Sequence, residues 1–517
     1  MKRFLILILL AVVVYFSNLG GTSIYVLDEA KNAGCAMEMY SRKDLIVPTF
    51  NNLLRTDKPP LHYFSMMFSF SLFGITPFAA RFFSALCGVL LVAFLYRKIR
   101  TIVNENVAFL SCLILLSSLQ MAVQFHLAVP DPYLILLMTL CFLSFYTGFH
   151  DNPRHFYLMY VSAALAFLTK GLIAVVLPAL VIFSYLIYIH QMSWYLVKRI
   201  KLWQGTLLFL LITVPWYAAV GYATGGKWLE GFFISHNFSR YTSTMEGHGG
   251  FFLAPVMILI VSLLPFSMFI IQACRLAVRR NENTFLMYCM IIIAVVAVFF
   301  TFSKTILPSY PAPAIPFLAA VLGYYLNSFL ETQRTNLTAH IAIAVHMLIA
   351  VTLPFAAFLV LQAESNLSSL KQLSFYLCIL PVGALVGWIL LFRSNKLGFI
   401  YANVAAWIGT SLVFFYLISP QIDKRNPVVE SLSFIRNRFP DREIIGYKQF
   451  NPAYVFALKH PIPVVTSLDS IARQGTGGKT VILTRRTYEI EYNDPSLHII
   501  YSGKDLFEKN ETVVLVN

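Results

Sequence analysis

Charged and aromatic residues that could do chemistry stand at the ends of long apolar stretches of this sequence. Asp28 and Glu29 follow the first stretch, Asp57 and Lys58 open a motif that continues Pro-Pro-Leu, and Asp131 lies between two prolines. Further polar residues in comparable positions are Lys170, His236, Arg240, His248, Lys304 and Tyr310. Because a polar group at membrane depth is costly, their recurrence indicates a site at a membrane boundary.

Carboxylates and cations gathered at a lipid boundary suit the transfer of a sugar from a polyprenyl phosphate. A carboxylate can act as the base or orient the acceptor, while the phosphate hardly needs a general acid in order to leave. Lys, Arg or a metal ion would stabilise the charge that develops on the departing phosphate. The sequence carries no nucleotide-binding fingerprint, so a donor delivered by the membrane itself meets the requirement.

Each of these residues also has an ordinary structural explanation. Asp131 could cap the start of a helix, and Asp28 with Glu29 could mark another helix start. Lys170 and Lys304 could extend from the ends of spans toward the membrane surface. These explanations serve for single residues, but the recurrence of such residues at one end of the spans favours a site.

The composition identifies the elements that must position these residues as membrane helices. Of the 517 residues, 58% are apolar and 12% are charged, whereas a soluble globular chain carries about 25% charged residues. A soluble enzyme, a disordered chain and a fibrous protein are excluded, which leaves a polytopic membrane protein. The net charge of +15 suggests loops that face anionic lipid. The sequence has no basic run interleaved with aromatic residues, so nucleic-acid binding is not expected. The 7 cysteines form no Cys-x-x-Cys pair, so neither a disulfide framework nor a thiolate zinc site is expected.

About thirteen segments are apolar and long enough to cross a bilayer. The first follows Lys2 and Arg3, lacks a convincing cleavage site and is expected to remain as an anchor. The predicted segments are 4–20, 78–96, 107–126, 132–149, 156–169, 172–190, 205–221, 252–273, 285–302, 309–329, 339–361, 373–392 and 398–419.

The distribution of basic residues predicts the sidedness of these helices. With the N-terminus in the cytoplasm, the clusters at 97–100, 198–201 and 275–280 all fall in cytoplasmic loops, as the positive-inside rule requires. An odd number of spans then places the C-terminus outside. The long external loops are 21–77 and 222–251, and within the first the apolar segment 61–74 is too short to span and should lie along the interface.

The composition changes after Pro420. Residues 421–517 alternate amphipathic segments with short β-branched runs such as Thr-Val-Ile-Leu-Thr, a pattern typical of a small α/β domain. We therefore expect two domains, a helical membrane body at 1–420 and a small external α/β domain at 421–517 that stabilises or docks.

The order and spacing of the motifs resemble those of the lipid-linked glycosyltransferases typified by the bacterial 4-amino-4-deoxy-L-arabinose transferases (the ArnT type), relatives of the protein O-mannosyltransferases. The resemblance covers roughly 1–420 and implies a helical body of the GT-C type. The motifs that carry it are Asp28-Glu29, Asp44-Leu45-Ile46-Val47-Pro48, Asp57-Lys58-Pro59-Pro60-Leu61, Ala80-Arg81, Pro130-Asp131-Pro132, Thr169-Lys170-Gly171, Pro215-Trp216-Tyr217, His236-Asn237-x-x-Arg240 and Ser303-Lys304-Thr305-x-Leu307-Pro308-x-Tyr310.

The resemblance also implies a role for each matching residue. The catalytic carboxylates would be Asp28, which engages the acceptor or the donor sugar, its partner Asp131, and Glu29. The lipid phosphate would be bound by Lys58, Arg240 and Tyr310, with Lys170 and Lys304 as cationic support. Asp57 and His236 would hold a divalent metal such as zinc. This chain has Asp57 where the typified enzyme has Glu, which shortens the reach of that carboxylate.

The sequence therefore predicts a multi-pass glycosyltransferase of a bacterial inner membrane with its site on the periplasmic side. The donor would be undecaprenyl phosphate, or a related polyprenyl phosphate, that carries aminoarabinose or a hexose. The acceptor would be lipid A, another glycolipid, a glycan or a protein. A transporter or flippase of lipid-linked sugars is the alternative, and a catalytically silent scaffold whose tail binds a partner is a third possibility.

Overall fold

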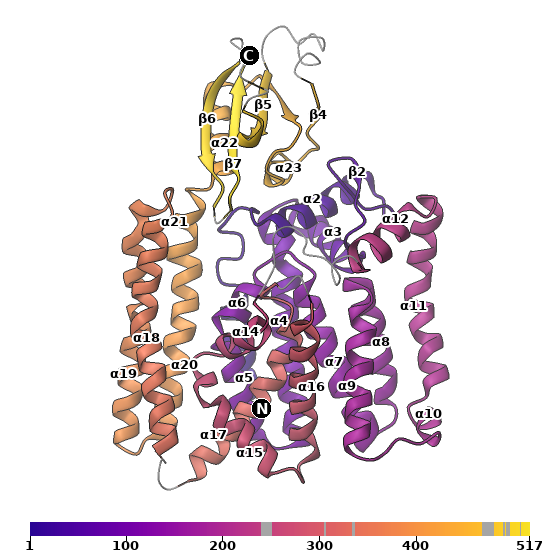
Figure 1. Ribbon diagram of the computed structural model, residues 1–517, viewed down its shortest axis with the longest axis vertical. Helices are drawn as coiled ribbons and strands as arrows, with labels where there is room; N and C mark the ends of the chain where they lie inside the picture. The colour runs from indigo at the N-terminus through magenta and orange to yellow at the C-terminus, as the bar shows by residue number, and fades with distance from the viewer. Residues whose placement is uncertain are drawn as a thin grey trace.

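The computed structural model describes residues 1–238, 251–303, 307–332, 337–467, 480–489, 492, 497–506 and 508–516, with side chains up to residue 235 in the first of these ranges. Figure 1 shows a bundle of long helices with a small mixed domain at one end. The α-helices of the bundle are α1 Lys2–Tyr15, α2 Leu27–Arg42, α3 Leu61–Phe73, α4 Pro77–Ile102, α5 Glu105–Leu116, α6 Leu119–Phe125, α7 Asp131–His150, α8 His155–Lys170, α9 Ile173–Tyr188, α10 Tyr195–Arg199, α11 Leu202–Ala223, α12 Lys227–Glu230, α14 Ala254–Ser262, α15 Ile270–Arg279, α16 Thr284–Thr301, α17 Ile315–Glu331, α18 Leu337–Ala363, α19 Ile379–Phe392, α20 Lys396–Val413 and α21 Ser419–Asp423.

Every segment predicted to cross the membrane contains a helix. Among the described residues, 8 helices are long and apolar enough to span, or up to 10 if two bent pairs each count as one span. The remaining predicted spans correspond to the shorter helices α1, α8 and α9. The mostly helical fold class is thus confirmed, and Leu61–Phe73 is the short apolar helix expected between the spans.

Two predicted spans are broken where the sequence suggested continuous helices. Helices α5 and α6 meet at an angle of 71°, and the pair Ala254–Ser262 and Phe266–Arg279 meets at 114°. The two breaks lie against each other, because the Ser118 hydroxyl donates to the carbonyl oxygen of Ser262 at 2.5 Å. Pro265 has no N–H group to continue the helical hydrogen bonds of the second pair.

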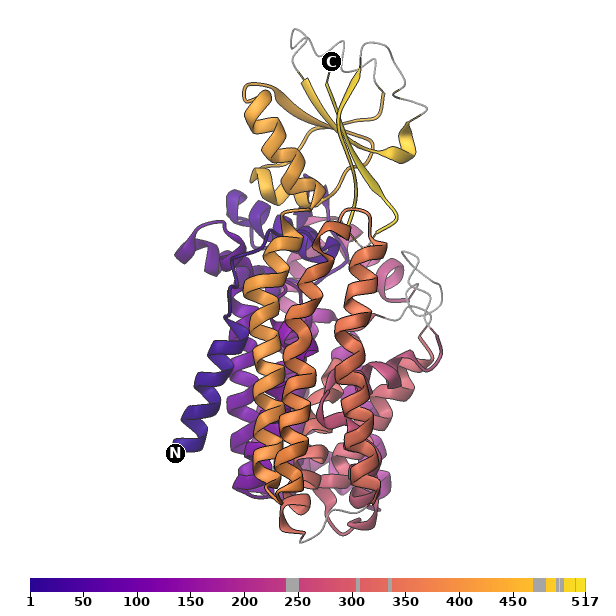
Figure 2. The ribbon, with the colours of Figure 1, turned by 90° about the vertical axis from the view of Figure 1, so that its left-hand side faces the viewer.

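Burial separates central helices from peripheral ones. In the 18-residue apolar stretch of α7, 94% of the residues are buried inside the protein, whereas in the corresponding stretch of α18 the share is 22%. Figure 2 shows α18, α19 and α20 standing side by side along the bundle. A helix this apolar and this exposed requires lipid around it, so α18 faces the bilayer while α7 forms part of the protein core.

The C-terminal domain is built on a five-stranded sheet in the order β4-β3-β5-β7-β6. Strand β3 runs parallel to β4 and β5, while β7 runs antiparallel to β5 and β6. Two helices pack with the sheet. The small C-terminal domain that the predicted fold class included is therefore present. The elements are α22 Pro427–Arg438, β3 Glu443–Tyr447, α23 Ala453–Leu458, β4 Val464–Val465, β5 Thr480–Arg485, β6 His498–Lys504 and β7 Glu511–Val516.

The end of the bundle that meets this domain, here called the domain end, is where the loops carrying the candidate residues lie. Helices α2 and α3 cover it beneath the domain (Figure 1), together with the hairpin of β1 (Thr49–Phe50) and β2 (Leu53–Leu54). The N-terminus lies toward the opposite part of the bundle (Figure 2). Helices α2 and α3 share one apolar core with α22, α23 and the sheet, so the domain and the bundle are packed together.

Candidate functional site

The candidate residues come together at the domain end from the start of α2, the loop before α3, the start of α7, the end of α8 and the segment before α17. Asp28 and Glu29 lie in the first turn of α2, and Asp131 is the first residue of α7. Lys170 ends α8. Acidic groups in a first turn and a basic group in a last turn are favourable arrangements with the helix dipole, so local structure alone already stabilises these charges.

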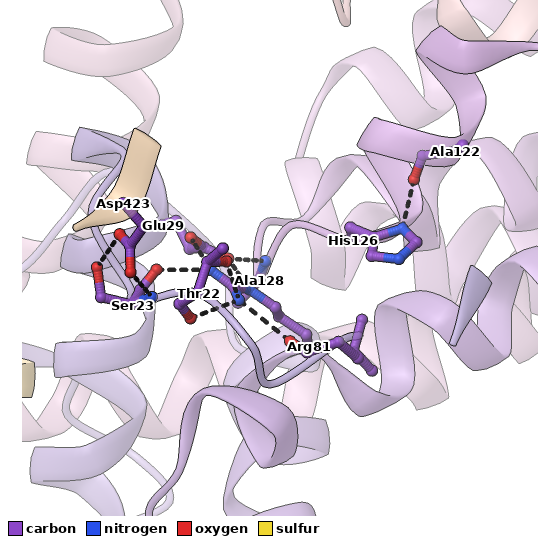
Figure 3. Close-up of polar contacts among 9 residues, drawn as sticks. Thr22, Ser23, Glu29, Arg81, Ala122, His126, Ala128 and Asp423 are labelled. Atoms are coloured by element: carbon purple, nitrogen blue, oxygen red, sulfur yellow. Dashed lines mark hydrogen bonds and ion pairs between the residues drawn. The ribbon is translucent and has the colours of Figure 1, made fainter. Parts of the chain in front are cut away.

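Glu29 forms a buried ion pair with Arg81 of α4 (Figure 3). Arg81 donates Nε to Oε1 at 2.7 Å and Nη2 to Oε2 at 2.9 Å, and the backbone N–H of Ala128 also donates to Oε1 at 2.9 Å. The remaining guanidinium donors bind carbonyl oxygens of Leu19, Thr22 and Ser23. Both charges are therefore fully hydrogen-bonded, which is what makes their burial tolerable.

This arrangement, here called the Glu29–Arg81 hub, fixes the two other carboxylates relative to each other. Asp28 adjoins Glu29 in α2, and Asp131 begins α7 just after Ala128, whose N–H binds Glu29. Figure 3 shows the connection before α2, the α6–α7 loop and Arg81 of α4 converging there. The hub thus places the starts of α2 and α7 at the same end of the bundle.

Asp131, Lys170 and Tyr310 form a second cluster. Lys170 Nζ donates to Asp131 Oδ1 at 2.7 Å and lies 5.3 Å from the centroid of the Tyr310 ring. The side chains of Lys170 and Asp131 are 16% and 10% exposed, so solvent or a ligand can reach them. A cation beside a carboxylate and a phenol can bind a phosphate group and at the same time orient a hydroxyl.

A third cluster surrounds Asp57 and Lys58. Arg55 binds Asp57 in a two-pronged arrangement, Nε to Oδ1 at 2.6 Å and Nη2 to Oδ2 at 2.9 Å. Arg55 Nη2 also donates to Asn32 Oδ1 at 3.0 Å, and Asn32 lies one turn after Asp28 on the same face of α2. Lys58 is buried, with 4% of its surface exposed. The predicted phosphate-binding lysine thus lies buried beside the Arg55–Asp57 ion pair, on the loop that binds α2 through Asn32.

His62 of α3 lies within this third cluster, with Nε2 at 3.4 Å from Asn32 Oδ1. Burial lowers the pKa of His62 well below its usual value, and the charges of Arg55 and Lys58 lower it further. The imidazole is therefore neutral at neutral pH. It adds no positive charge to this cluster and can serve as a hydrogen-bonding group.

The residues that the structure describes do not fit a divalent metal at Asp57. Both carboxylate oxygens of Asp57 already accept from Arg55, and the nearby guanidinium and ammonium groups repel a cation. No group of three or more His, Cys, Asp or Glu residues suited to a metal occurs within the described ranges. The side chain of His236, the second predicted ligand, lies outside them.

The structure thus brings together many of the residues that the sequence singled out. Asp28, Glu29, Asp57, Lys58, Asp131, Lys170 and Tyr310 all lie at the domain end. Arg240, Lys304, His248 and the side chain of His236 are outside the described residues, and their predicted roles stay predictions.

Sequence reasoning gave no role to Arg81, although Ala80-Arg81 is among the motifs of the resemblance, and it missed the partners Arg55, Asn32 and His62. A signal was present for Arg81, because an arginine near the start of a long apolar helix must find an anion. The loop motif Arg-Thr-Asp-Lys also contained the Arg55–Asp57 pair. Nothing in the sequence indicates that the Asn32 oxygen would meet the Arg55 guanidinium, since that contact depends on how the loop folds back onto α2.

Comparison with known proteins gives the same picture. Residues 57–218 match the family model described as dolichyl-phosphate-mannose-protein mannosyltransferase. An uncharacterized protein of Aquifex aeolicus is 31% identical over 331 residues, which cover 63% of this chain and 74% of that protein. An undecaprenyl phosphate-alpha-4-amino-4-deoxy-L-arabinose arabinosyl transferase of Proteus mirabilis is 26% identical over 82% of this chain and 77% of its own length.

The fold is shared with a solved structure. The crystal structure of ArnT from Cupriavidus metallidurans bound to undecaprenyl phosphate has a TM-score of 0.83 at 20% identity, and covers 99% of this chain and 97% of its own. Among the curated relatives named as arabinosyl transferases, the chain spans from 57% to 83% of their lengths.

The helical body with its small mixed domain has the fold of the ArnT structure, which is of the GT-C type, and the family model and the named curated relatives are membrane glycosyltransferases. The chain belongs to the family of polyprenyl-phosphate-dependent glycosyltransferases that includes the ArnT proteins and is related to the protein mannosyltransferases.

Proposed function

We propose that the protein transfers a sugar from a polyprenyl phosphate to an acceptor at the domain end of the bundle. The observation that carries the proposal is the convergence of Asp28, Asp131, Lys58 and Lys170 from four separate elements onto that end. Support comes from the shared fold of the ArnT structure that was solved with undecaprenyl phosphate. The comparisons lend nothing to the alternative of a flippase.

Asp28 acts as the general base in this proposal. Its carboxylate takes the proton of the acceptor hydroxyl while the acceptor oxygen bonds to the anomeric carbon and the bond from that carbon to the phosphate oxygen breaks. The electron pair of the broken bond stays on the phosphate, and a direct displacement inverts the anomeric carbon. Asp28 is half-buried, which leaves its position accessible to an acceptor.

The cationic groups stabilise the departing phosphate. The phosphate gains one negative charge when the sugar leaves, so positive groups around it bind the transition state more tightly than the donor. Lys58, Lys170 and Tyr310 would supply this stabilisation, with Arg240 and Lys304 joining them as predicted from the sequence. Asp131 holds the Lys170 ammonium, which orients that cation for the phosphate.

Glu29 has a positioning role in this proposal. Both of its oxygens are engaged by Arg81 and Ala128, so its carboxylate is neither accessible nor free to take a proton. It binds the start of α2 to the segment just before α7 and thereby places Asp28 and Asp131. The divalent metal implied for Asp57 and His236 stays outside the proposal, because Arg55 already neutralises Asp57.

The domain end is proposed to face the periplasm of a bacterial inner membrane. The basic clusters at 97–100, 198–201 and 275–280 lie in the last turns of α4, α10 and α15 or directly after them, at helix ends away from that side, as the positive-inside rule demands near cytoplasmic loops. A donor whose lipid tail lies in the membrane then reaches the site laterally, without any soluble energy source.

The sugar and the acceptor are identified together by mass spectrometry. Glycolipids, glycans and membrane proteins from cells with and without the protein are compared, and cells that carry Asp28→Asn serve as the matched control. A pentose or hexose increment on one of these acceptors, present only with the unaltered protein, is the expected result. A lipid-linked sugar that accumulates on the periplasmic leaflet without any glycosylated product, in cells with the unaltered protein and in cells with Asp28→Asn alike, would indicate a flippase instead.

A further inference from the structure

We propose that the C-terminal domain and the short helix leading into it position Asp28, by holding the connection between α1 and α2. This inference rests on the proposed function, because it assigns the domain a role in the reaction of Asp28. The contacts that carry it form three sets, at Ser23, at Tyr25 and at the far end of α2.

The first contact joins Ser23 to Asp423 at the end of α21. The Ser23 N–H donates to Asp423 Oδ2 at 2.8 Å, and the Ser23 hydroxyl donates to Oδ1 at 2.5 Å (Figure 3). Asn426, which caps the start of α22, donates its side-chain amide to the Ser23 hydroxyl oxygen at 3.1 Å. Both the backbone and the side chain of Ser23 are thus bound by the segment that enters the domain.

The second contact joins Tyr25 to the domain itself. The backbone N–H of Leu506 donates to the Tyr25 hydroxyl at 2.9 Å. The Tyr25 ring packs against a small apolar cluster that contains Leu361, Leu367 and Leu506. The connection between α1 and α2 is therefore held at Ser23 and at Tyr25. Asp28 follows shortly after them, in the first turn of α2.

The third set of contacts holds the other end of α2. Asn51, in the β1–β2 hairpin, donates to the carbonyl oxygen of Ile462 at 2.9 Å and accepts from the Ile462 N–H at 2.6 Å. Glu38 of α2 in turn accepts from the N–H of Asn51 at 2.5 Å. The face of α2 between these ends shares its apolar core with α22 and α23.

Helix α2 is consequently fixed along its whole length by the C-terminal part of the chain. A reacting group must lie within a few tenths of an ångström of its productive place, and a shift of about 1 Å can cost about 100-fold in rate. The contacts at Ser23 and Tyr25 lie immediately before the helix that carries Asp28. Loosening them frees the backbone just before Asp28 to shift, so the Asp28 carboxylate leaves its productive place, while the Glu29–Arg81 hub keeps α2 docked on the bundle.

The test uses the full chain in lipid nanodiscs and compares Asp423→Ala, Ser23→Ala and the double variant. We expect kcat for sugar transfer to fall about 10-fold in each, with the KM for the lipid-linked donor within about twofold of the unaltered protein. The double variant should lose less than the product of the two single effects, because both substitutions remove the bond from the Ser23 hydroxyl to Asp423. Ser23→Thr keeps the hydroxyl and should therefore keep the kcat of the unaltered protein, in contrast to Ser23→Ala.

A matched control is available in the chain. Lys504 of the domain binds Glu364 of the bundle at 2.9 Å, a contact of similar length that does not touch the connection between α1 and α2. Glu364→Gln removes it and should leave kcat unchanged. The thermal unfolding midpoint of all variants is measured in parallel, so that a loss of folded protein is not read as a loss of rate.

The outcomes separate this inference from the proposed function. If Asp28→Asn abolishes transfer but Asp423→Ala and Ser23→Ala keep the unaltered kcat, the positioning role is wrong while the proposed function stands. An equal fall in kcat for Glu364→Gln and Asp423→Ala would also overturn the inference, because any contact of the domain would then suffice. If Asp28→Asn itself transfers sugar normally, the proposed function fails first.

Discussion

Two ion pairs at the domain end differ in how completely their charges are satisfied. In the Glu29–Arg81 pair the side chains are 1% and 5% exposed, and three donors reach the carboxylate. In the Asp131–Lys170 pair the side chains are 10% and 16% exposed, and within the described part of the chain Asp131 accepts at Oδ1 from Lys170. The first pair is closed to ligands, and the second has capacity left to bind one.

One small region of the molecule can therefore be both rigid and reactive. Saturated buried charges hold helices in place, because moving them would expose an unsolvated ion. Charges that keep some access to solvent, as in the Asp131–Lys170 pair, contribute less to stability than saturated buried ones and can exchange partners with a substrate. We therefore attribute stability to Glu29 and Arg81 and, as part of the proposed function, binding of the donor phosphate to Lys170.

The contrast between the closed Glu29–Arg81 pair and the open Asp131–Lys170 pair would be wrong if the closed pair proved dispensable for folding. Glu29→Ala leaves the Arg81 guanidinium buried without its anion, and we expect a loss of about 3–5 kcal/mol in the free energy of unfolding. Denaturation in detergent, followed by circular dichroism, measures the change. Asp131→Ala is the matched variant of the open pair and should cost clearly less, because the Lys170 ammonium keeps more access to water than the Arg81 guanidinium. Equal losses in the two variants would contradict the distinction.

The open pair should show the opposite balance. Lys170→Ala removes a cation from the departing phosphate, so we expect transfer to slow by about 10–100-fold with an unfolding midpoint close to that of the unaltered protein. Single-turnover kinetics with a polyprenyl phosphate sugar measure the rate. Lys170→Arg keeps the charge and should recover part of it. A normal rate in Lys170→Ala would remove this residue from the site.

A smaller effect is expected from His62, whose folded-state pKa lies below its value in the unfolded chain. The unfolded chain then binds the extra proton as the pH falls below about 6.5, so His62 costs stability there, up to about 1.4 kcal/mol per pH unit. The unaltered protein should lose stability between pH 6.5 and pH 5 more steeply than His62→Gln. Parallel stability curves for the two proteins would show that His62 is not buried in its neutral form.

The smallest effect concerns metal. Because Arg55 occupies both oxygens of Asp57, a chelator should leave the transfer rate unchanged within about twofold, and elemental analysis of purified protein should find less than one zinc per chain. Arg55→Gln provides the comparison, since it exposes Asp57 to cations. A stoichiometric metal in the unaltered protein, together with loss of rate on chelation, would show that Asp57 exchanges Arg55 for the ion.

Much of the fold could be predicted because it follows from hydropathy. Helices such as α4, α7 and α18 were found from their apolar composition, which must match the thickness of a bilayer whatever their neighbours are. The breaks in two spans were not predicted, because the Ser118 hydroxyl that stabilises one break binds a carbonyl oxygen far away in sequence.

The candidate site was predictable in its location and less so in its pairing. Asp131 and Lys170 stand at the ends of predicted spans on the same side, so their proximity follows from topology. The partner of Glu29 depends on an arginine that lies in another helix, and the carboxylate types alone do not distinguish a positioning acid from a reacting one. Only burial, with Glu29 enclosed by Arg81 and Ala128, separates Glu29 from Asp28.

The most direct test of the central claim is the release of free polyprenyl phosphate and the formation of glycosylated acceptor by purified protein in nanodiscs, with and without Asp28→Asn. We expect coupled release and transfer by the unaltered protein, and a rate at least about 100-fold lower for a folded Asp28→Asn variant, because an amide cannot take the proton of the acceptor hydroxyl. Transfer by Asp28→Asn at the normal rate would contradict the account.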